Sequence, residues 1–178
     1  MSNLETNLRS YLGMKMIVQI LFVIFLSSVY VSGGEPPSGN KNGVYKMAMP
    51  NITTSAPDTY LCIVVSLKSI SNNPVYITGF RPDSDASRAH HMLLHKCNAP
   101  YKTEEGVSWN CLHMPTCNDQ AQIIYGWARN ADNLKLPDGV SFTLDPEEIH
   151  YLVLQVHYSE VIAQPDTSSL ALEISHEP

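Results

Sequence analysis

Seven histidines are the residues of this 178-residue chain that are best suited to chemistry. His90 and His91 are adjacent and follow a polar stretch at 83–88, and His157 lies near the end of an apolar-rich stretch at 151–158. Three neutral imidazoles without a thiolate or carboxylate suit copper or zinc, and the stability order of divalent ions favours copper. The alternative interpretation is a hydrogen-bonded His90–His91 pair with His157 as a separate rim residue.

The elements that must position these histidines are β-strands. Alternation along residues 149–158 places Gln155 and His157 together on the face opposite the apolar core face. Gln155 is therefore expected to hydrogen-bond a ring nitrogen of a ligand and to orient it. Adjacent strand residues point to opposite faces, so His90 and His91 reach one ion only where the backbone is kinked or is just entering the sheet. Their place at the start of a predicted strand meets this condition.

The remaining histidines have weaker contexts. His95 follows His91 by four residues on the same strand face, and we expect a solvated edge histidine, with an approach to the metal site as the alternative. His113 is expected on a disulfide-bounded loop, while His150 and His176 have no distinguishing context. No Ser-His-Asp order, phosphate-binding glycine loop or pair of isolated buried carboxylates is recognisable in the sequence.

Short β-branched and aromatic runs separated by turn residues predict the fold. The expected strands are residues 60–67, 75–80, 89–96, 121–128, 140–144, 149–158 and 170–175. Such short strands with spaced turns indicate an all-β fold, an antiparallel β-sandwich of jelly-roll-like type. Trp109 and Trp127 are expected to pack in its core. We find no convincing amphipathic helix.

Residues 1–33 are predicted to be a secretory signal peptide. The apolar run at 16–31 follows Arg9 and Lys15 and ends in small residues near Gly33, as a signal-peptidase site requires. The run is short for a membrane span, which needs about 20 residues. An uncleaved signal anchor through residues 16–31 stays open as the alternative, because the polar leader is long. We therefore expect the secretory pathway or the extracellular space.

Charge and cysteine content narrow the function class. The chain has 11 Lys and Arg against 17 Asp and Glu, a net charge of −6, which argues against nucleic-acid binding. An even number of cysteines in an oxidising compartment predicts two disulfides, and spacing alone does not decide their pairing. A zinc site formed by these cysteines is disfavoured because no Cys-x-x-Cys pair occurs. The four cysteines are Cys62, Cys97, Cys111 and Cys117.

Residues 34–50 are rich in Gly, Pro and Asn and are predicted to be a linker before a domain at 51–178. The Met47-x-Met49 pair within it suits cuprous ion but is interpreted as incidental in a flexible linker. Asn51 begins the only glycosylation sequon, Asn-Ile-Thr, and we expect a glycan there on an exposed segment.

Several strings resemble one known family. The string HHMLLHKC at 90–97, continuing into CNAP, resembles the copper type II, ascorbate-dependent monooxygenases, and most closely the peptidylglycine α-hydroxylating monooxygenases. Supporting strings are DTYLC at 58–62, YGWARNAD at 125–132, LPDGV at 136–140 and YLVLQVHY at 151–158. These strings follow one another in the family's order, and this collinearity is more specific than any one of them.

The resemblance implies a function. It implies that His90, His91 and His157 hold the electron-storing copper, which is loaded by ascorbate, and that Gln155 and Tyr60 lie near it. The family reaction uses molecular oxygen to hydroxylate the α-carbon of the C-terminal glycine of a peptide, the first step of peptide amidation. The resemblance also implies the secretory granule lumen as a location. The family's disulfide pattern implies the pairs Cys62–Cys111 and Cys97–Cys117 in this chain.

Two of the departures from the family pattern concern the metal sites. An aromatic residue stands in the family where this chain has His95, so the wall beside the histidine pair is expected to be more polar. The family binds its second, catalytic copper through a His-x-His pair and a Met in a following β-domain, and no His-x-His occurs in this chain. We therefore expect this chain to carry the electron-storing copper domain without the catalytic one.

Three functions stay open at this point. The first is a secreted peptidylglycine monooxygenase represented by a fragment or splice form. The second is a single-domain secreted copper-binding or electron-transfer protein without hydroxylase activity. The third is a zinc hydrolase or lyase with three histidine ligands and an open coordination position.

Overall fold

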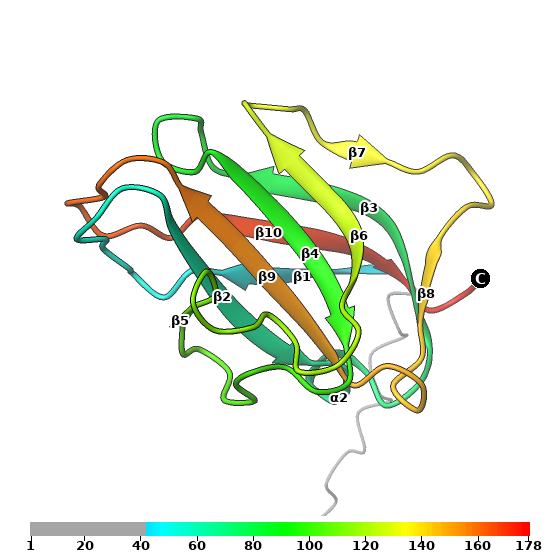
Figure 1. Ribbon diagram of the computed structural model, residues 1–178. Helices are drawn as coiled ribbons and strands as arrows, with labels where there is room; N and C mark the ends of the chain where they lie inside the picture. The colour runs from blue at the N-terminus through cyan, green and yellow to red at the C-terminus, as the bar shows by residue number, and fades with distance from the viewer. Residues whose placement is uncertain (1–41) are drawn as a thin grey trace, which may run out of the picture. The chain divides into compact units, whose positions relative to one another are not determined.

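The computed structural model describes residues 42–178. These residues form two five-stranded antiparallel sheets that pack face to face (Figure 1). The predicted all-β sandwich is therefore confirmed. Each of the seven predicted strands is present, and the sequence patterns missed three further strands.

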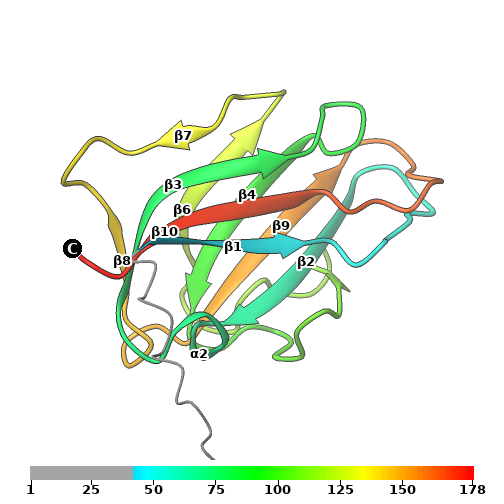
Figure 2. The same cartoon turned by 180° about the vertical axis from the view of Figure 1, so that it is seen from behind.

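The first sheet, here the β10 sheet, has the order β1-β10-β3-β7, with β8 also paired to β3 (Figure 2). Its strands are β1 (Asn42–Ala48), β3 (Val75–Asp83), β7 (Leu134–Lys135), β8 (Phe142–Leu144) and β10 (Ser169–Ser175).

The second sheet, here the β9 sheet, has the order β5-β2-β9-β4-β6. Its strands are β2 (Thr59–Ser66), β4 (His91–Cys97), β5 (Trp109–Asn110), β6 (Gln122–Ala128) and β9 (Tyr151–Tyr158). A single helical turn, α2 (Leu67–Ile70), follows β2.

The linker prediction is wrong for residues 42–48, because this segment is β1 and pairs with β10 along its whole length. Met47 and Met49 are each only 1% exposed, so they belong to the hydrophobic core and are not an incidental pair in a flexible segment. Burial of these two side chains explains why the segment is ordered against the sheet. The predicted signal peptide and the rest of the predicted linker lie outside the described residues. Within residues 42–178 no helix is long and apolar enough to cross a membrane.

The main core lies between the two sheets. Leu152, Leu154 and Val156 of β9 are fully buried there, as the alternation of that strand predicted. Phe80 stacks on Tyr125 with ring centroids 4.2 Å apart, which joins the two sheets. Truncating one of these buried aliphatic side chains to alanine costs about 2–5 kcal/mol, so this core is what fixes the strand positions.

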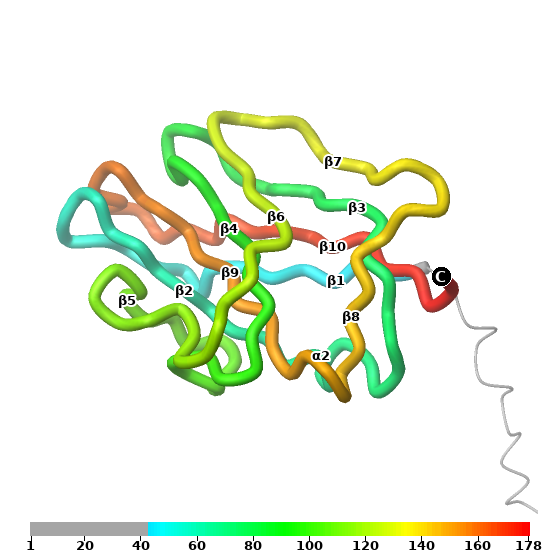
Figure 3. The backbone as a smooth tube through the Cα atoms, turned by 45° about the vertical axis from the view of Figure 1, so that its right-hand side comes forward, coloured from blue at the N-terminus to red at the C-terminus, as the bar shows by residue number. Residues whose placement is uncertain are grey.

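A second, smaller apolar cluster lies on the outer face of the β9 sheet. The segment between β4 and β6, which contains β5, runs beside β2 and β9 (Figure 3) and is attached by both disulfides. Trp109 packs in this outer cluster and not in the sandwich core, whereas Trp127 packs in the core as predicted. The other members of the outer cluster are Cys62, Val64, Cys97, Cys111, Cys117 and Val153.

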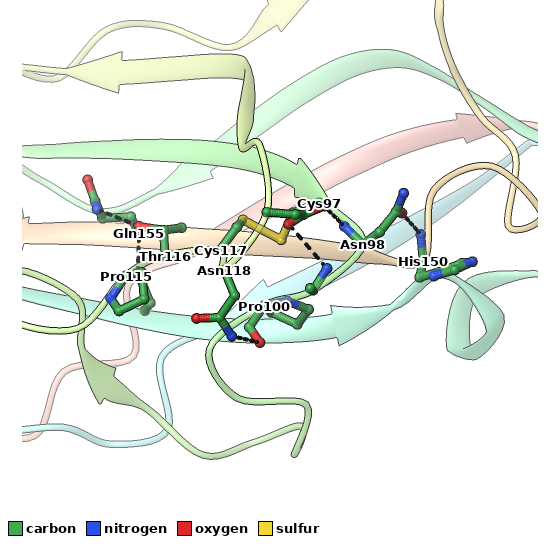
Figure 4. Close-up of a disulfide and its surroundings, with 12 residues drawn as sticks. Cys97, Asn98, Pro100, Pro115, Thr116, Cys117, Asn118, His150 and Gln155 are labelled. Carbon is green, nitrogen blue, oxygen red and sulfur yellow. Dashed lines mark hydrogen bonds between the residues drawn. A yellow bond between two sulfur atoms is a disulfide. The ribbon is translucent and has the colours of Figure 1, made fainter.

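The two disulfides are Cys62–Cys111 and Cys97–Cys117, the pairing that the family resemblance implies. Figure 4 shows the second bridge and the polar contacts that surround it. The Asp119 carboxylate accepts hydrogen bonds from the backbone amides of Asn98 (2.9 Å) and Ala99 (3.2 Å). The segment is therefore fastened to the end of β4 through Cys97 and to β2 through Cys62.

Candidate metal centre

The three predicted ligands lie together where β9 ends and where β2 and β4 begin. Figure 1 shows these strand ends side by side. His90 Nδ1 lies 3.3 Å from His91 Nδ1 and 3.2 Å from His157 Nδ1. The remaining distance, between His157 Nδ1 and His91 Nδ1, is 3.4 Å. The same edge of each imidazole therefore faces a common centre, and His157 is not a separate rim residue.

These distances can be compared with the requirements of a metal ion. Metal–nitrogen bonds of about 2.0–2.1 Å at tetrahedral angles place ligand nitrogens about 3.3–3.4 Å apart. A neutral imidazole that carries its hydrogen on Nε2 presents a lone pair at Nδ1, and three lone pairs directed at one point favour a cation there. The residues present therefore fit a copper or zinc ion held by three Nδ1 atoms.

Strand register explains how residues far apart in the sequence meet. His91 pairs with His157 across β4 and β9, so the two side chains leave the sheet on the same face. His90 lies one residue before β4, and its amide donates to the His157 carbonyl oxygen at 2.8 Å. The adjacent histidines thus share one centre because the first of them has not yet entered the alternation of the strand.

Polar contacts hold the loop that delivers His90. The Asp85 carboxylate accepts hydrogen bonds from the amide and the hydroxyl of Ser87, and these bonds lower the pKa of Asp85 below its usual range. Arg88 forms a salt bridge of 3.2 Å with Asp166, whose side chain is 1% exposed. Asp166 also accepts a hydrogen bond of 2.8 Å from the hydroxyl of the buried Tyr158, one residue after His157. The loop and the end of β9 are therefore tied to one buried carboxylate.

Tyr60 and Gln155, the two residues expected near the metal, differ in what they contact. Tyr60 lies opposite His157 in the β2–β9 pairing and stacks on its imidazole, with centroids 4.0 Å apart and planes 9° apart. The Gln155 amide instead donates to Thr116 Oγ1 at 3.4 Å (Figure 4). It also donates to Cys111 Sγ at 3.7 Å. Gln155 therefore contacts the disulfide-bounded segment, and the stacking ring of Tyr60 makes the direct contact with a ligand.

His95 is not the solvated edge residue that the sequence suggested. It is 7% exposed, and neither ring nitrogen has a hydrogen-bond partner within residues 42–178. It pairs with Val153, and a four-residue separation along a strand places it about 13 Å from His91. His95 is therefore buried on β4, in the same sheet as the metal centre, without reaching the centre.

The other predicted site residues lie apart from the three histidines. Asn51 is exposed, with a left-handed φ of 52°, at a bend after β1. Asp119 groups with Cys97 and Cys117, but the two sulfurs are joined to each other and offer no ligand. His113, His150 and His176 are exposed and do not belong to the cluster of potential ligands.

The electrostatics of the centre favour neutral ligands. Burial lowers the pKa of the His91 imidazole below its ordinary value, and the neighbouring His157 and His90 act in the same direction. A lower pKa means that the ring is neutral over a wider pH range, which metal binding requires. His91 is thus prepared as a ligand by its surroundings.

Asp58 also contacts His157, and no pattern in the sequence predicts this contact. Its Oδ1 lies 3.2 Å from His157 Nε2, on the ring edge opposite Nδ1. Asp58 belongs to the DTYLC string, but it precedes β2 and carries no periodic signal. Only the cross-strand pairing of β2 with β9 brings it to the histidine.

Comparisons with known proteins agree with this geometry. The profile of the family described as copper type II ascorbate-dependent monooxygenase, N-terminal domain, matches residues 45–165, a range that includes all three histidines. The chain is 40% identical over 129 residues to peptidyl-glycine alpha-amidating monooxygenase B of Xenopus laevis, which covers 72% of this chain and 14% of that protein. It is 35% identical over 147 residues to peptidyl-glycine alpha-amidating monooxygenase of Mus musculus, and this alignment covers 80% of this chain and 14% of that protein. The chain therefore spans only about one seventh of the length of these relatives.

Proposed function

Because the chain belongs to the copper type II ascorbate-dependent monooxygenases by its match to their N-terminal domain, we propose that residues 42–178 form the electron-storing copper domain of a peptidylglycine α-hydroxylating monooxygenase. The observation that carries this proposal is the convergence of three Nδ1 atoms, from His90, His91 and His157, within 3.4 Å of one another. Copper bound there supplies one-electron storage, filled from ascorbate, for hydroxylation of the α-carbon of a C-terminal glycine.

The residues of the chain have defined tasks in this function. The three imidazoles bind through Nδ1, and burial keeps His91 neutral and available. Tyr60 holds the plane of the His157 ring by stacking on it. The pairing of β4 with β9 fixes the distance between His91 and His157 before any metal arrives, so little reorganisation is needed on binding.

The compartment and the reactants follow from the same proposal. Two disulfides favour an oxidising compartment, which supports the secretory pathway, its granule lumen or the extracellular space. Ascorbate, oxygen and glycine-extended peptides are the reactants that we propose for the complete enzyme. Residues 1–178 contain no His-x-His spacing, so we propose that this chain stores an electron and does not itself carry the oxygen-activating metal.

A copper-binding or electron-transfer protein without hydroxylase activity is the second candidate. It would use the same three histidines as copper ligands. A histidine-only zinc enzyme is the third reading of the site, and it differs in the metal that is bound.

Metal analysis of the purified chain tests the proposal. We expect one copper per chain, with a cupric electron paramagnetic resonance signal that ascorbate removes. His157→Ala should reduce the affinity for copper strongly by deleting one of three ligands, whereas His176→Ala, at an exposed position outside the cluster, should leave it unchanged. Equal copper retention by the two variants would refute the ligand assignment, and a silent spectrum with stoichiometric zinc would favour the zinc enzyme.

A further inference from the structure

We propose that Asp58 is a positioning residue of the metal centre, which holds His157 in the tautomer that carries its hydrogen on Nε2. This inference rests on the proposed copper site, since its purpose is to leave the Nδ1 lone pair of His157 free for the metal. The two ring nitrogens of His157 face different partners. Nε2 faces the Asp58 carboxylate at 3.2 Å, and Nδ1 faces His90 and His91 at 3.2 and 3.4 Å.

The chemistry of the carboxylate decides which nitrogen carries the hydrogen. An ionised carboxylate only accepts hydrogen bonds, so the contact with Asp58 requires a hydrogen on Nε2. In a neutral imidazole the other nitrogen then has a lone pair, and that nitrogen is the one directed at the centre. A carboxylate on the far edge of a ligating imidazole also raises its basicity and fixes its orientation.

The backbone around Asp58 keeps the carboxylate in place. The Asp58 amide donates to the Ser159 carbonyl oxygen at 3.3 Å, so the residue is fastened to the chain just beyond His157. Its φ of 51° is left-handed, a conformation that aspartate adopts more readily than most residues. Tyr60, two residues further along, stacks on the same ring. The start of β2 therefore contacts one face and one edge of the His157 imidazole.

The exposure of the two partners sets the expected size of the effect. The His157 side chain is 8% exposed, whereas the Asp58 side chain is 77% exposed. Because water screens the carboxylate, we expect its loss to weaken copper binding by about 10-fold, the lower end of the range for partners of metal ligands. A purely structural role would leave the tautomer of His157 unchanged.

The tautomer can be read without any metal. Long-range proton–nitrogen correlation spectra of the histidine-labelled, metal-free full chain at about pH 8, where imidazoles are neutral, distinguish Nε2–H from Nδ1–H rings. We expect His157 of the wild-type chain to carry its hydrogen on Nε2. A predominant Nδ1–H form in the wild-type chain would overturn the proposal, and this result needs no variant that folds.

Three variants complete the test. Asp58→Gly removes the carboxylate and tolerates the left-handed φ, so we expect a mixture of tautomers and about 10-fold weaker copper binding. Asp58→Asn keeps a carbonyl acceptor and should retain the Nε2–H form. Asp138→Asn removes an exposed carboxylate between β7 and β8 and should match the wild type.

The outcomes separate this inference from the proposed function. Unchanged tautomer and copper affinity in Asp58→Gly would refute the role of Asp58 while leaving the copper site intact. Absence of copper binding by the wild-type chain would refute the proposed function, and the metal-free spectra would still decide whether Asp58 selects the tautomer.

Discussion

Replacing the buried His95 by phenylalanine should stabilise the domain. His95 is 7% exposed, and its two ring nitrogens have no partner among the described residues. Leaving a buried polar group without a hydrogen bond costs about 1–3 kcal/mol, a cost that His95→Phe removes. The larger ring reduces the gain through crowding. Ile123, the cross-strand neighbour of His95 on the edge strand β6, is 55% exposed.

Because both ring nitrogens lack partners, the removed polar cost lies near the upper end of that range, about 3 kcal/mol. Crowding by the slightly larger ring costs about 1 kcal/mol, so the net stabilisation at neutral or higher pH is about 1–2 kcal/mol. For a domain of about 140 residues this corresponds to a rise in melting temperature of about 3–7 °C.

The effect of His95→Phe should grow as the pH falls. Burial lowers the pKa of His95 below its ordinary value of 6.5. Between the folded-state pKa and 6.5, the unfolded chain therefore binds a proton that the folded chain does not, so the free energy of unfolding of the wild type decreases on acidification. Phenylalanine does not titrate, so the free energy of unfolding of the variant lacks this decrease. The lowered pKa of His91 contributes equally to both proteins and cancels in the comparison.

Urea unfolding of the metal-free chain, with both disulfides intact, measures this difference at pH 8, 6 and 5. His176→Phe, a substitution at an exposed histidine, serves as the control and should match the wild type at each pH. The reasoning is refuted if His95→Phe is less stable than the wild type at pH 8. It is equally refuted if the difference between the two proteins does not change between pH 8 and pH 5.

Two further predictions concern the disulfides and the activity. Bridges that close 20 and 49 residues constrain the unfolded chain by about 3 and about 4 kcal/mol, so alanine at Cys97 and Cys117 should cost less than alanine at Cys62 and Cys111. Non-reducing urea titrations check the order, and a reversed order would contradict the loop-entropy estimate. Supplied with copper, ascorbate, oxygen and a glycine-extended peptide, the chain should form no α-hydroxyglycine, and fusion to the second copper domain of a complete homologue should restore turnover. Steady product formation by the chain alone, abolished by His157→Ala, would mean that one copper site both stores the electron and activates oxygen.

The strands were predictable where the side chains alternate. Residues 149–158 show an apolar face and a second face that carries Gln155 and His157, and the structure has this strand as β9. β1 was missed because the Gly, Pro and Asn content of residues 34–50 hid the alternation that leads to Met47. The two-residue strands β5 and β7 are too short to form any pattern.

The sequence by itself determined the identity of the three candidate ligands, through residue type, through their places at strand ends and through a family resemblance. Only the tertiary structure shows that their Nδ1 atoms converge, that Asp58 reaches the far edge of His157, and that His95 is buried. The physical reason is that local alternation reports only the face to which a side chain points. Which residues meet on that face depends on cross-strand register and on what covers the sheet, and both are set by contacts between segments far apart in the chain.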